Sequence, residues 1–406
     1  MKERENRRKA NAECSDGRQL ETTMVEQNRQ ETATATDTSG HFPSLTMERL
    51  KENYHNLVRE QAIYYPVAYR FVRELGRGRQ GIVFLGLRQG SRGCITRHAI
   101  KLFDPSIYRS PREYWTDMGR IAAQTSILQT IRSPNLVARD VYEETGGIGY
   151  VQMEAIMGFD LRFILTGGHL ERVRQASSPE EWSRYTDVIF RLGGPRPAIQ
   201  PGVALYIMRQ MLRGLEALHE LGFLHCDVKP SNTMIDRLGY VKLIDYGRAI
   251  RIGERPLFLL GSPMYMAPEI HRRERFTVQA DIYSVGIVGL EMLTGRPLIE
   301  SGRPSESELL EIKRGLPDRI PQLLPDDVRR NETLVALLRR FVEFTPENRF
   351  GSASEAESSS GLRIVHRQLT QLGKDTEYGR ELEAYLEKLL PPVKSQNQNV
   401  DIHTMF

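Results

Sequence analysis

One stretch, HCDVKPSNTMIDRLGYVKLIDYG from His225, contains Asp227, Lys229, Asn232 and Asp245 with strand-like apolar segments between them. A polar side chain beside buried segments needs a partner or a ligand. These residue types suit phosphoryl transfer, which depends on positioning and on charge stabilisation. Asp227 could accept the proton of an attacking hydroxyl, and Lys229 could neutralise a moving phosphoryl group. Asn232 and Asp245 offer hard oxygen ligands for Mg²⁺.

A glycine-rich loop lies upstream. The segment LGRGRQGIV places glycines at positions 76, 78 and 81. Dinucleotide-binding folds use the same spacing, but there the loop opens directly into a helix. Here the apolar run IVFL (82–85) follows, which predicts a strand. We therefore expect a hairpin whose backbone can approach phosphates, with a glycine-rich turn that binds no ligand as the alternative.

Lys101 lies in the next apolar run, RHAIKLF (97–103), between Ile100 and Leu102. An ammonium group in such a strand should pair with an anion. The alternative is a lysine at a strand edge that points to water.

A strand-rich region followed by a helix-rich region must position these residues. The runs GIVFLGL (81–87) and RHAIKLF (97–103) predict strands, and one helix is expected from about Arg112 to Ile131. Further on, VALYIMRQMLRGLEALHELG (203–222) places Met and Leu residues on one helical face. The segment DIYSVGIVGLEML (281–293) is apolar nearly all round, which predicts a core helix. The fold class is therefore α+β, with a cleft between two lobes as the expected ligand site.

The chain divides by composition into five parts. Residues 1–45 are polar and poor in bulky apolar residues, so we expect disorder there. The other expected parts are a short helical lead-in (46–63), a strand-rich lobe (64–153), a helix-rich lobe (154–372) and a tail (373–406) with one amphipathic segment. Within the second lobe, residues 166–201 are interpreted as a surface insertion with a short helix from about Trp182 to Leu192.

The bulk composition excludes several classes of protein. The chain has 406 residues, is 40% hydrophobic, and carries 56 Lys and Arg against 52 Asp and Glu, so no nucleic-acid partner is indicated. The three cysteines, Cys14, Cys94 and Cys226, have no metal-ligand spacing and form no disulfide framework. No apolar run reaches the length of a membrane span, and no signal peptide is visible. We expect a cytoplasmic protein without membrane partners, and the sequence does not predict its oligomeric state.

The ordered set of motifs resembles the eukaryotic-type Ser/Thr protein kinase family over about three quarters of the chain. The glycine loop, AIK (99–101), MEA (153–155), HCDVKPSN (225–232) and DYG (245–247) follow the family order, with Tyr246 in place of the usual Phe. They are followed by GSPMYMAPE (261–269), DIYSVG (281–286) and TPENRF (345–350). The resemblance implies a two-lobed protein kinase-like fold, with a strand-rich N-lobe that has one main helix and a helix-rich C-lobe.

The resemblance also implies ATP and Mg²⁺ as cofactors and proteins as substrates. It makes Asp227 the catalytic base, supported by Lys229, and it makes Asn232 and Asp245 the metal ligands. In the same family, Asp281 anchors the catalytic loop and Arg349 pairs with Glu269. The ATP-binding residues that it implies are Leu75, Gly76, Gly78, Gly81, Val83, Ala99, Lys101, Glu154, Ala155 and Met234.

The sequence departs from the family pattern in two places. Gln124 stands where the helix after Lys101 should present a glutamate; it can hydrogen-bond Lys101 but supplies no charge, so we expect a weakened active alignment. Cys226 stands where many relatives have Arg, and the segment 248–260 has no Ser, Thr or Tyr. Activity is therefore expected not to depend on phosphorylation in that segment.

Two other functions stay open. The first is a nucleotide-binding pseudokinase that acts as a scaffold or allosteric partner, although such a protein would not need Lys101, Asp227, Asn232 and Asp245 together. The second is a small-molecule kinase of similar fold, against which the GSPMYMAPE segment weighs, because in the family it supports a peptide substrate.

Overall fold

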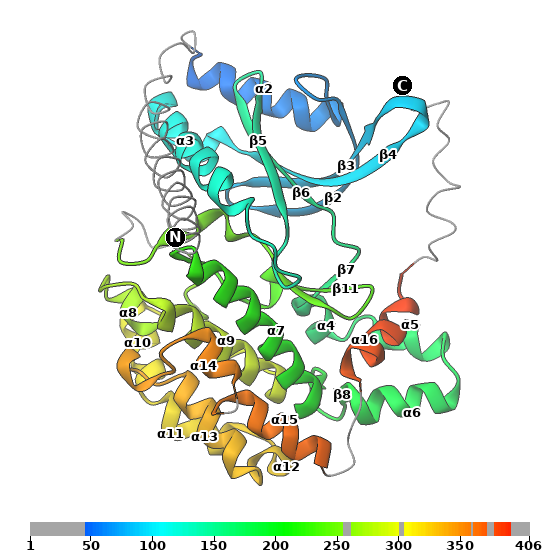
Figure 1. The fold of residues 1–406 in the computed structure, drawn as a ribbon, viewed down its shortest axis with the longest axis vertical. Helices are drawn as coiled ribbons and strands as arrows, with labels where there is room; N and C mark the ends of the chain where they lie inside the picture. The colour runs from blue at the N-terminus through cyan, green and yellow to red at the C-terminus, as the bar shows by residue number, and fades with distance from the viewer. Residues whose placement is uncertain (1–44, 255–260, 300–303, 359, 372–376, 391–406) are drawn as a thin grey trace, which may run out of the picture.

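The computed structural model describes residues 45–254, 261–299, 304–358, 360–371 and 377–390 (Figure 1). The polar segment 1–44, for which disorder was expected, lies outside the described residues, as does the end of the segment 248–260. No helix among the described residues is long and apolar enough to cross a membrane.

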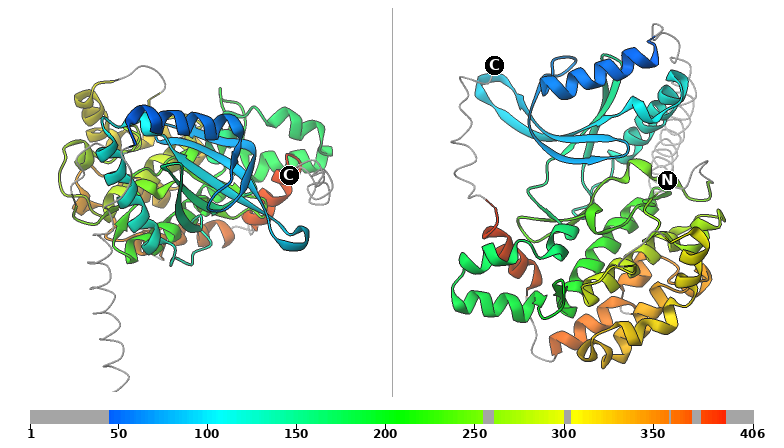
Figure 2. Two further views of the ribbon diagram at one scale, coloured as in Figure 1. Left: turned by 90° about the horizontal axis from the view of Figure 1, so that it is seen from above. Right: turned by 180° about the vertical axis from the view of Figure 1, so that it is seen from behind.

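The strand-rich lobe is a six-stranded antiparallel sheet in the order β1-β2-β3-β4-β6-β5. Its strands are β1 (Ala62–Ile63), β2 (Tyr69–Gly78), β3 (Gly81–Gln89), β4 (Ile95–Phe103), β5 (Arg139–Thr145) and β6 (Ile148–Glu154). Two helices cover the sheet: α2 (Met47–Glu60), at the expected position, lies along its outer side, and α3 (Pro111–Leu128) packs beside β5 (Figures 1 and 2). Ser110 begins α3 because its hydroxyl accepts a hydrogen bond from the Glu113 amide, and Pro111 is compatible with the first helical position.

The second lobe is built around the helix α9 (Val278–Thr294), whose residues from Ala280 to Leu293 are all buried, as its apolar sequence predicts. The helix α7 (Pro201–Glu220) packs on α9 with the predicted face, on which Met208, Met211 and Leu212 are fully buried. Other helices of this lobe are α4 (Leu161–Thr166), α8 (Pro268–His271), α10 (Glu306–Arg314), α11 (Leu316–Leu323), α12 (Asp326–Arg329), α13 (Glu332–Phe341), α14 (Ala353–Glu357) and α15 (Leu362–Gln371). The two-lobed α+β architecture is therefore confirmed.

Two small sheets carry the polar motifs into the region between the lobes. One has the order β12-β11-β7 and contains β7 (Gly158–Asp160), β11 (Thr233–Asp236) and β12 (Val241–Leu243). The other pairs β10 (Phe223–Leu224) with β13 (Ile250–Arg251). The Val137 amide donates to the Leu243 carbonyl at 3.0 Å, which ties the segment before β5 to the strand that precedes Asp245.

The segment 166–201 is more than a surface insertion. It forms α5 (Leu170–Gln175), α6 (Pro179–Val188), β8 (Phe190–Arg191) and β9 (Ala198–Ile199), so the predicted helix exists but ends four residues earlier, at Val188. Several of its apolar side chains are buried, including Val173, Tyr185 and Phe190. They are covered because the amphipathic tail segment forms α16 (Tyr378–Glu387), which packs beside α6 (Figure 1). Arg184 of α6 pairs with the buried Glu381 of α16.

Candidate active site

The glycine loop is the tip of the β2–β3 hairpin, with Gly78 paired to Gly81 across the two-residue turn. Gly81 has φ 142°, and a Cβ there would lie 1.9 Å from the Leu102 carbonyl oxygen, so no other residue fits. A Cβ on Gly76 or Gly78 would meet nothing within 4 Å. The backbone of the loop is therefore open to a ligand, and the predicted hairpin is confirmed.

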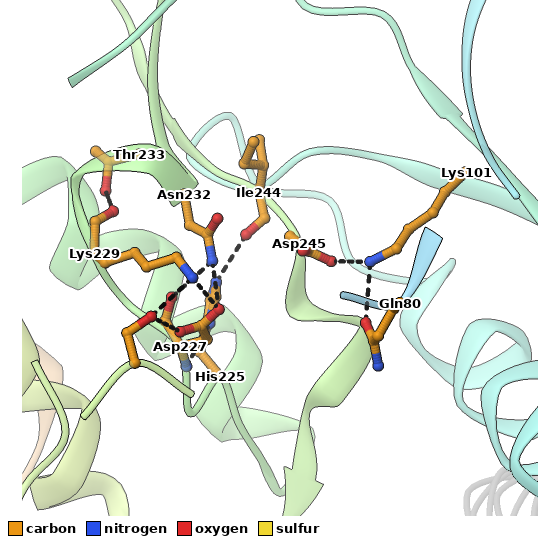
Figure 3. Close-up of polar contacts among 10 residues, drawn as sticks. Gln80, Lys101, His225, Asp227, Lys229, Asn232, Thr233, Ile244 and Asp245 are labelled. Carbon is orange, nitrogen blue, oxygen red and sulfur yellow. Dashed lines mark hydrogen bonds and ion pairs between the residues drawn. The ribbon is translucent and has the colours of Figure 1, made fainter. Parts of the chain in front are cut away.

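Lys101 lies in a central strand of the sheet and is only 5% exposed, which excludes a lysine that points to water. Its ammonium donates to Asp245 Oδ1 at 2.5 Å and to Gln80 Oε1 at 3.2 Å (Figure 3). The buried strand, the glycine-loop tip and the end of β12 thus converge on one cation. Burial raises the pKa of Asp245, but the charge and the hydrogen bond of Lys101, together with the charges of Arg139 and His225, lower the pKa below its usual value.

Gln124 does not contact Lys101, and the expected hydrogen bond between them is therefore wrong for this structure. Its amide nitrogen donates to the Ala249 carbonyl at 2.5 Å, and its oxygen accepts from Arg120 at 3.1 Å. The side chain satisfies a buried carbonyl that a carboxylate could not satisfy. Gln124 thus links α3 to the segment after the DYG motif rather than to Lys101.

Asp227 is the centre of a second polar group, formed by the loop between β10 and β11 (Figure 3). Lys229 Nζ donates to Asp227 Oδ2 at 2.7 Å, and Asn232 Nδ2 donates to the same oxygen at 3.0 Å. Ser262 Oγ donates to the other carboxylate oxygen at 3.1 Å and accepts from Lys229 at 3.0 Å. Ser262 comes from the GSPMYMAPE segment, which is thereby placed against the predicted base.

The buried carboxylate of Asp281 anchors the loop that carries Asp227. It accepts hydrogen bonds from the backbone amides of His225 (2.8 Å) and Cys226 (2.9 Å), the second of which has a left-handed φ of 63°. It also accepts from His219 Nε2 at 2.9 Å, a contact that the sequence reading missed. Burial would raise the pKa of Asp281, but these donors lower it below its usual value. The anchoring role implied by the family resemblance is visible in this geometry.

The two polar groups are joined through backbone contacts. The Ile244 amide donates to the Asn232 carbonyl at 2.9 Å, and the His225 ring contacts the Ile244 carbonyl at 3.1 Å, so Asn232 lies beside Asp245 (Figure 3). Because the amide nitrogen of Asn232 is used by Asp227, its side-chain oxygen is left for a cation. Among the described residues, no three His, Cys, Asp or Glu side chains are grouped as a metal site. The side-chain oxygens of Asn232 and Asp245 fit Mg²⁺, whose remaining ligands would come from phosphate and water.

The other residues implied to bind ATP line the facing edges of the two lobes. Ala99 is buried on β4 opposite Met153, and Val83 is paired with Lys101. Leu75 on β2 is 40% exposed, Met234 lies on β11, and Ala155 follows Glu154 between β6 and β7. The Glu154 carboxylate forms an ion pair with Lys242 of β12 at 3.1 Å, which links the two lobes at this point.

The end of the GSPMYMAPE segment is held by two buried charges. Arg349 pairs with Glu269 through two hydrogen bonds of 2.7 and 2.9 Å, as the resemblance implies. Lys313 of α10, which is fully buried, donates to the carbonyls of Pro263 (2.7 Å) and Met266 (2.6 Å). Sequence reasoning missed Lys313, because α10 reads as an ordinary amphipathic helix.

A groove of about 570 Å³ lies away from this site, between α11, α13 and the segment around Asn348. Its arginines are engaged in ion pairs, such as Arg339 with Asp318 and Arg340 with Glu355. The candidate site itself is defined by its converging polar groups.

The comparisons with known proteins agree with this geometry. Residues 69–359 match the family described as protein kinase domain. The chain is 28% identical over 243 residues to a probable serine/threonine-protein kinase of Bifidobacterium longum (58% of this chain, 28% of that protein). It is also 28% identical over 300 residues to ribosomal protein S6 kinase 2 alpha of Xenopus laevis (73% and 35%). It is 44% identical over 92 residues to mitogen-activated protein kinase kinase kinase 17 of Arabidopsis thaliana (22% and 24%). The matched segments span about a third or less of the length of these relatives.

Proposed function

Because this chain belongs to the protein kinase family, we propose that it is an ATP- and Mg²⁺-dependent kinase that transfers the γ-phosphoryl group to Ser or Thr hydroxyls of protein substrates. The observation that carries the proposal is the pair of connected polar groups. Lys101 and Asp245 form one group, and Asp227, Lys229 and Asn232 form the other. Relatives named as serine/threonine kinases support this reaction class.

In this mechanism Asp227 orients the acceptor hydroxyl and receives its proton. Its carboxylate is fixed by Lys229, Asn232 and Ser262, so little reorganisation is needed when the hydroxyl arrives. Lys229, 2.7 Å from Asp227, is placed to neutralise charge on the moving phosphoryl group. When bound, Mg²⁺ would supply charge neutralisation at the phosphate oxygens, with Asn232 and Asp245 as its protein ligands.

Nucleotide binding requires the Lys101–Asp245 ion pair to open. In this structure the ammonium and the carboxylate satisfy each other at 2.5 Å. For catalysis the ammonium must turn to the α- and β-phosphates. Since no helix carboxylate contacts Lys101, its orientation depends on Asp245 and Gln80 alone among the described residues.

This closed pair favours a second candidate, a nucleotide-binding pseudokinase that acts as a scaffold. Such a protein would bind ATP but transfer no phosphate. The ordered Asp227 group argues against this rival, because a scaffold has no use for a base held by three side chains.

Transfer of radiolabelled γ-phosphate from ATP to casein separates the two candidates. The wild type should label casein, and Asp227→Ala should lower the rate by at least about a hundredfold because the base is lost. Asp318→Ala is a matched control, since that carboxylate is exposed on α11 far from the site. Wild-type protein that binds ATP but gives no more label than Asp227→Ala would establish the scaffold instead.

A further inference from the structure

Arg139 is a buried cation beside the candidate site. It begins β5 opposite Met153, is 3% exposed, and none of its three guanidinium nitrogens has a hydrogen-bond partner among the described residues. Its guanidinium carbon lies 4.6 Å from the ring centroid of Tyr246, in the DYG motif. An unpaired buried charge carries a large desolvation cost, so a purely structural role would be better filled by an apolar residue.

The guanidinium adjoins the candidate nucleotide site. A Cβ built on Gly247 would lie 2.9 Å from Arg139 Nη2, 3.7 Å from Asp245 Oδ1 and 3.9 Å from Lys101 Nζ. Two cations and one carboxylate therefore converge on one point, and glycine at position 247 leaves room for them. Arg139 also acts on Asp245 through its charge, since after Lys101 it contributes to the lowered pKa of that carboxyl.

Among the described residues, no second carboxylate forms an ion pair with Lys101 or Arg139. The carboxylate of Asp245 is already paired with Lys101. Tyr246 cannot supply a negative charge, because burial raises its pKa to about 12 and its hydroxyl donates to the Val137 carbonyl. Gln124 of α3, in the place of the family's glutamate, is neutral. Of the two cations, Arg139 is therefore the one without a countercharge among the described residues, which leaves a surplus positive charge beside Asp245 before any ligand arrives.

We propose that Arg139 is a determinant of nucleotide binding: its fixed charge attracts the triphosphate and lowers the dependence of binding on a divalent metal. This inference rests on the proposed function. The anion that balances the surplus charge is the triphosphate itself. The two cations beside Asp245 also weaken the attraction of its carboxylate for Mg²⁺. Both effects reduce the advantage of Mg-ATP over metal-free ATP in binding.

Calorimetric titration with ATP, in excess EDTA and then in saturating MgCl₂, tests the proposal. The wild type should bind metal-free ATP with a Kd within about tenfold of its Kd for Mg-ATP. Arg139→Leu should weaken metal-free binding by at least about tenfold while changing the Mg-ATP Kd by less than about threefold. Arg139→Lys keeps the charge. Its ratio of the Kd for metal-free ATP to the Kd for Mg-ATP should therefore stay within about threefold of the wild-type ratio.

Thermal melting of the ligand-free proteins supplies the second readout. Removing an unpaired buried cation from apolar surroundings should leave the melting temperature of Arg139→Leu equal to or above that of the wild type. Arg139→Met repeats both measurements with a side chain closer in length to arginine. A neutral variant that melts lower, or that fails to fold, would assign Arg139 a structural role and overturn the proposal.

Three binding results also overturn it. If the neutral variants lose as much affinity for ATP in EDTA as in MgCl₂, Arg139 positions other residues of the site and does not attract the nucleotide through its charge. If they lose no affinity, or if Arg139→Lys behaves like Arg139→Leu, the charge does not act on the nucleotide. A wild type that binds no ATP in either condition refutes the proposed function itself, and this inference falls with it.

Discussion

Replacement of Asp281 by Asn tests how the catalytic loop is held. One carboxylate oxygen of Asp281 accepts from the His225 amide and from His219, and the other accepts from the Cys226 amide. Asparagine keeps only one acceptor oxygen, and its NH₂ group would face a donor. The substitution therefore removes a hydrogen bond to a charged group and leaves one buried donor unpaired.

The size of the effect follows from these contacts, since Asp281 is 1% exposed and solvent cannot replace a lost partner. A hydrogen bond to a charged group contributes about 1.5–3 kcal/mol, and an unsatisfied buried donor costs about 1–3 kcal/mol. Because these two terms overlap, we expect the free energy of unfolding to fall by about 2–5 kcal/mol. The loop carrying Asp227 should loosen as well, so kcat should fall while KM for ATP, which depends on the Lys101 side, changes little.

Urea denaturation followed by circular dichroism measures the free energy of unfolding, and casein labelling at varied ATP concentration measures kcat and KM. Asp318→Asn is the matched control: its carboxylate is 84% exposed and pairs with Arg339 at the surface, so its stability should stay within about 0.5 kcal/mol of the wild type. If Asp281→Asn is as stable and as active as this control, the carboxylate does not hold the loop, and the reasoning is refuted.

Three more substitutions probe other buried groups. Glu269→Gln should lower the free energy of unfolding by about 3–5 kcal/mol in urea, because it leaves the fully buried Arg349 without its countercharge; no change would show that the pair is dispensable. Burial lowers the pKa of Lys313 from 10.5 to about 7, so the unfolded chain binds more protons between these pH values and wild-type stability should rise with pH there. Lys313→Met should lose this rise, of up to about 1.4 kcal/mol per pH unit, in urea titrations at pH 7, 8 and 9, and an equal slope in both proteins would contradict it. Gln124→Glu should raise the casein-labelling rate a few-fold, because a carboxylate is repelled by the Ala249 carbonyl and free to turn to Lys101; an unchanged or lower rate would contradict this.

Much of the fold follows from local patterns in the sequence. The burial of Met208 and Leu212 on one face of α7 follows from helical periodicity, and the all-round burial of α9 follows from its uniform apolarity. The hairpin at Gly81 was predicted because a strand follows the glycines. The four polar residues of the opening motif were assigned to the site by their chemistry and by the resemblance of their segments to protein kinase motifs.

The remaining contacts depend on tertiary structure that no local pattern encodes. Gln124 reaches Ala249, and His219 reaches Asp281, across large separations in the chain. Arg139 lies between Ala138 and Asp140 at the start of a strand, where an arginine is typical of an exposed position. In the folded protein it packs against Tyr246 and is only 3% exposed. The burial of Tyr185 and Phe190 in the segment 166–201 likewise involves α16, which is distant in the sequence, through contacts with Tyr385.

The contact of α16 with α6 makes the two segments mutually dependent. Tyr385 of α16 is 1% exposed and lies edge-on to Tyr185 of α6, and its hydroxyl meets the buried His169. A protein shortened before Tyr378 would uncover these rings and leave Arg184 without Glu381. Any shortened version of this kinase domain should therefore retain both α6 and α16 or delete both, since either one alone exposes an apolar surface that promotes aggregation.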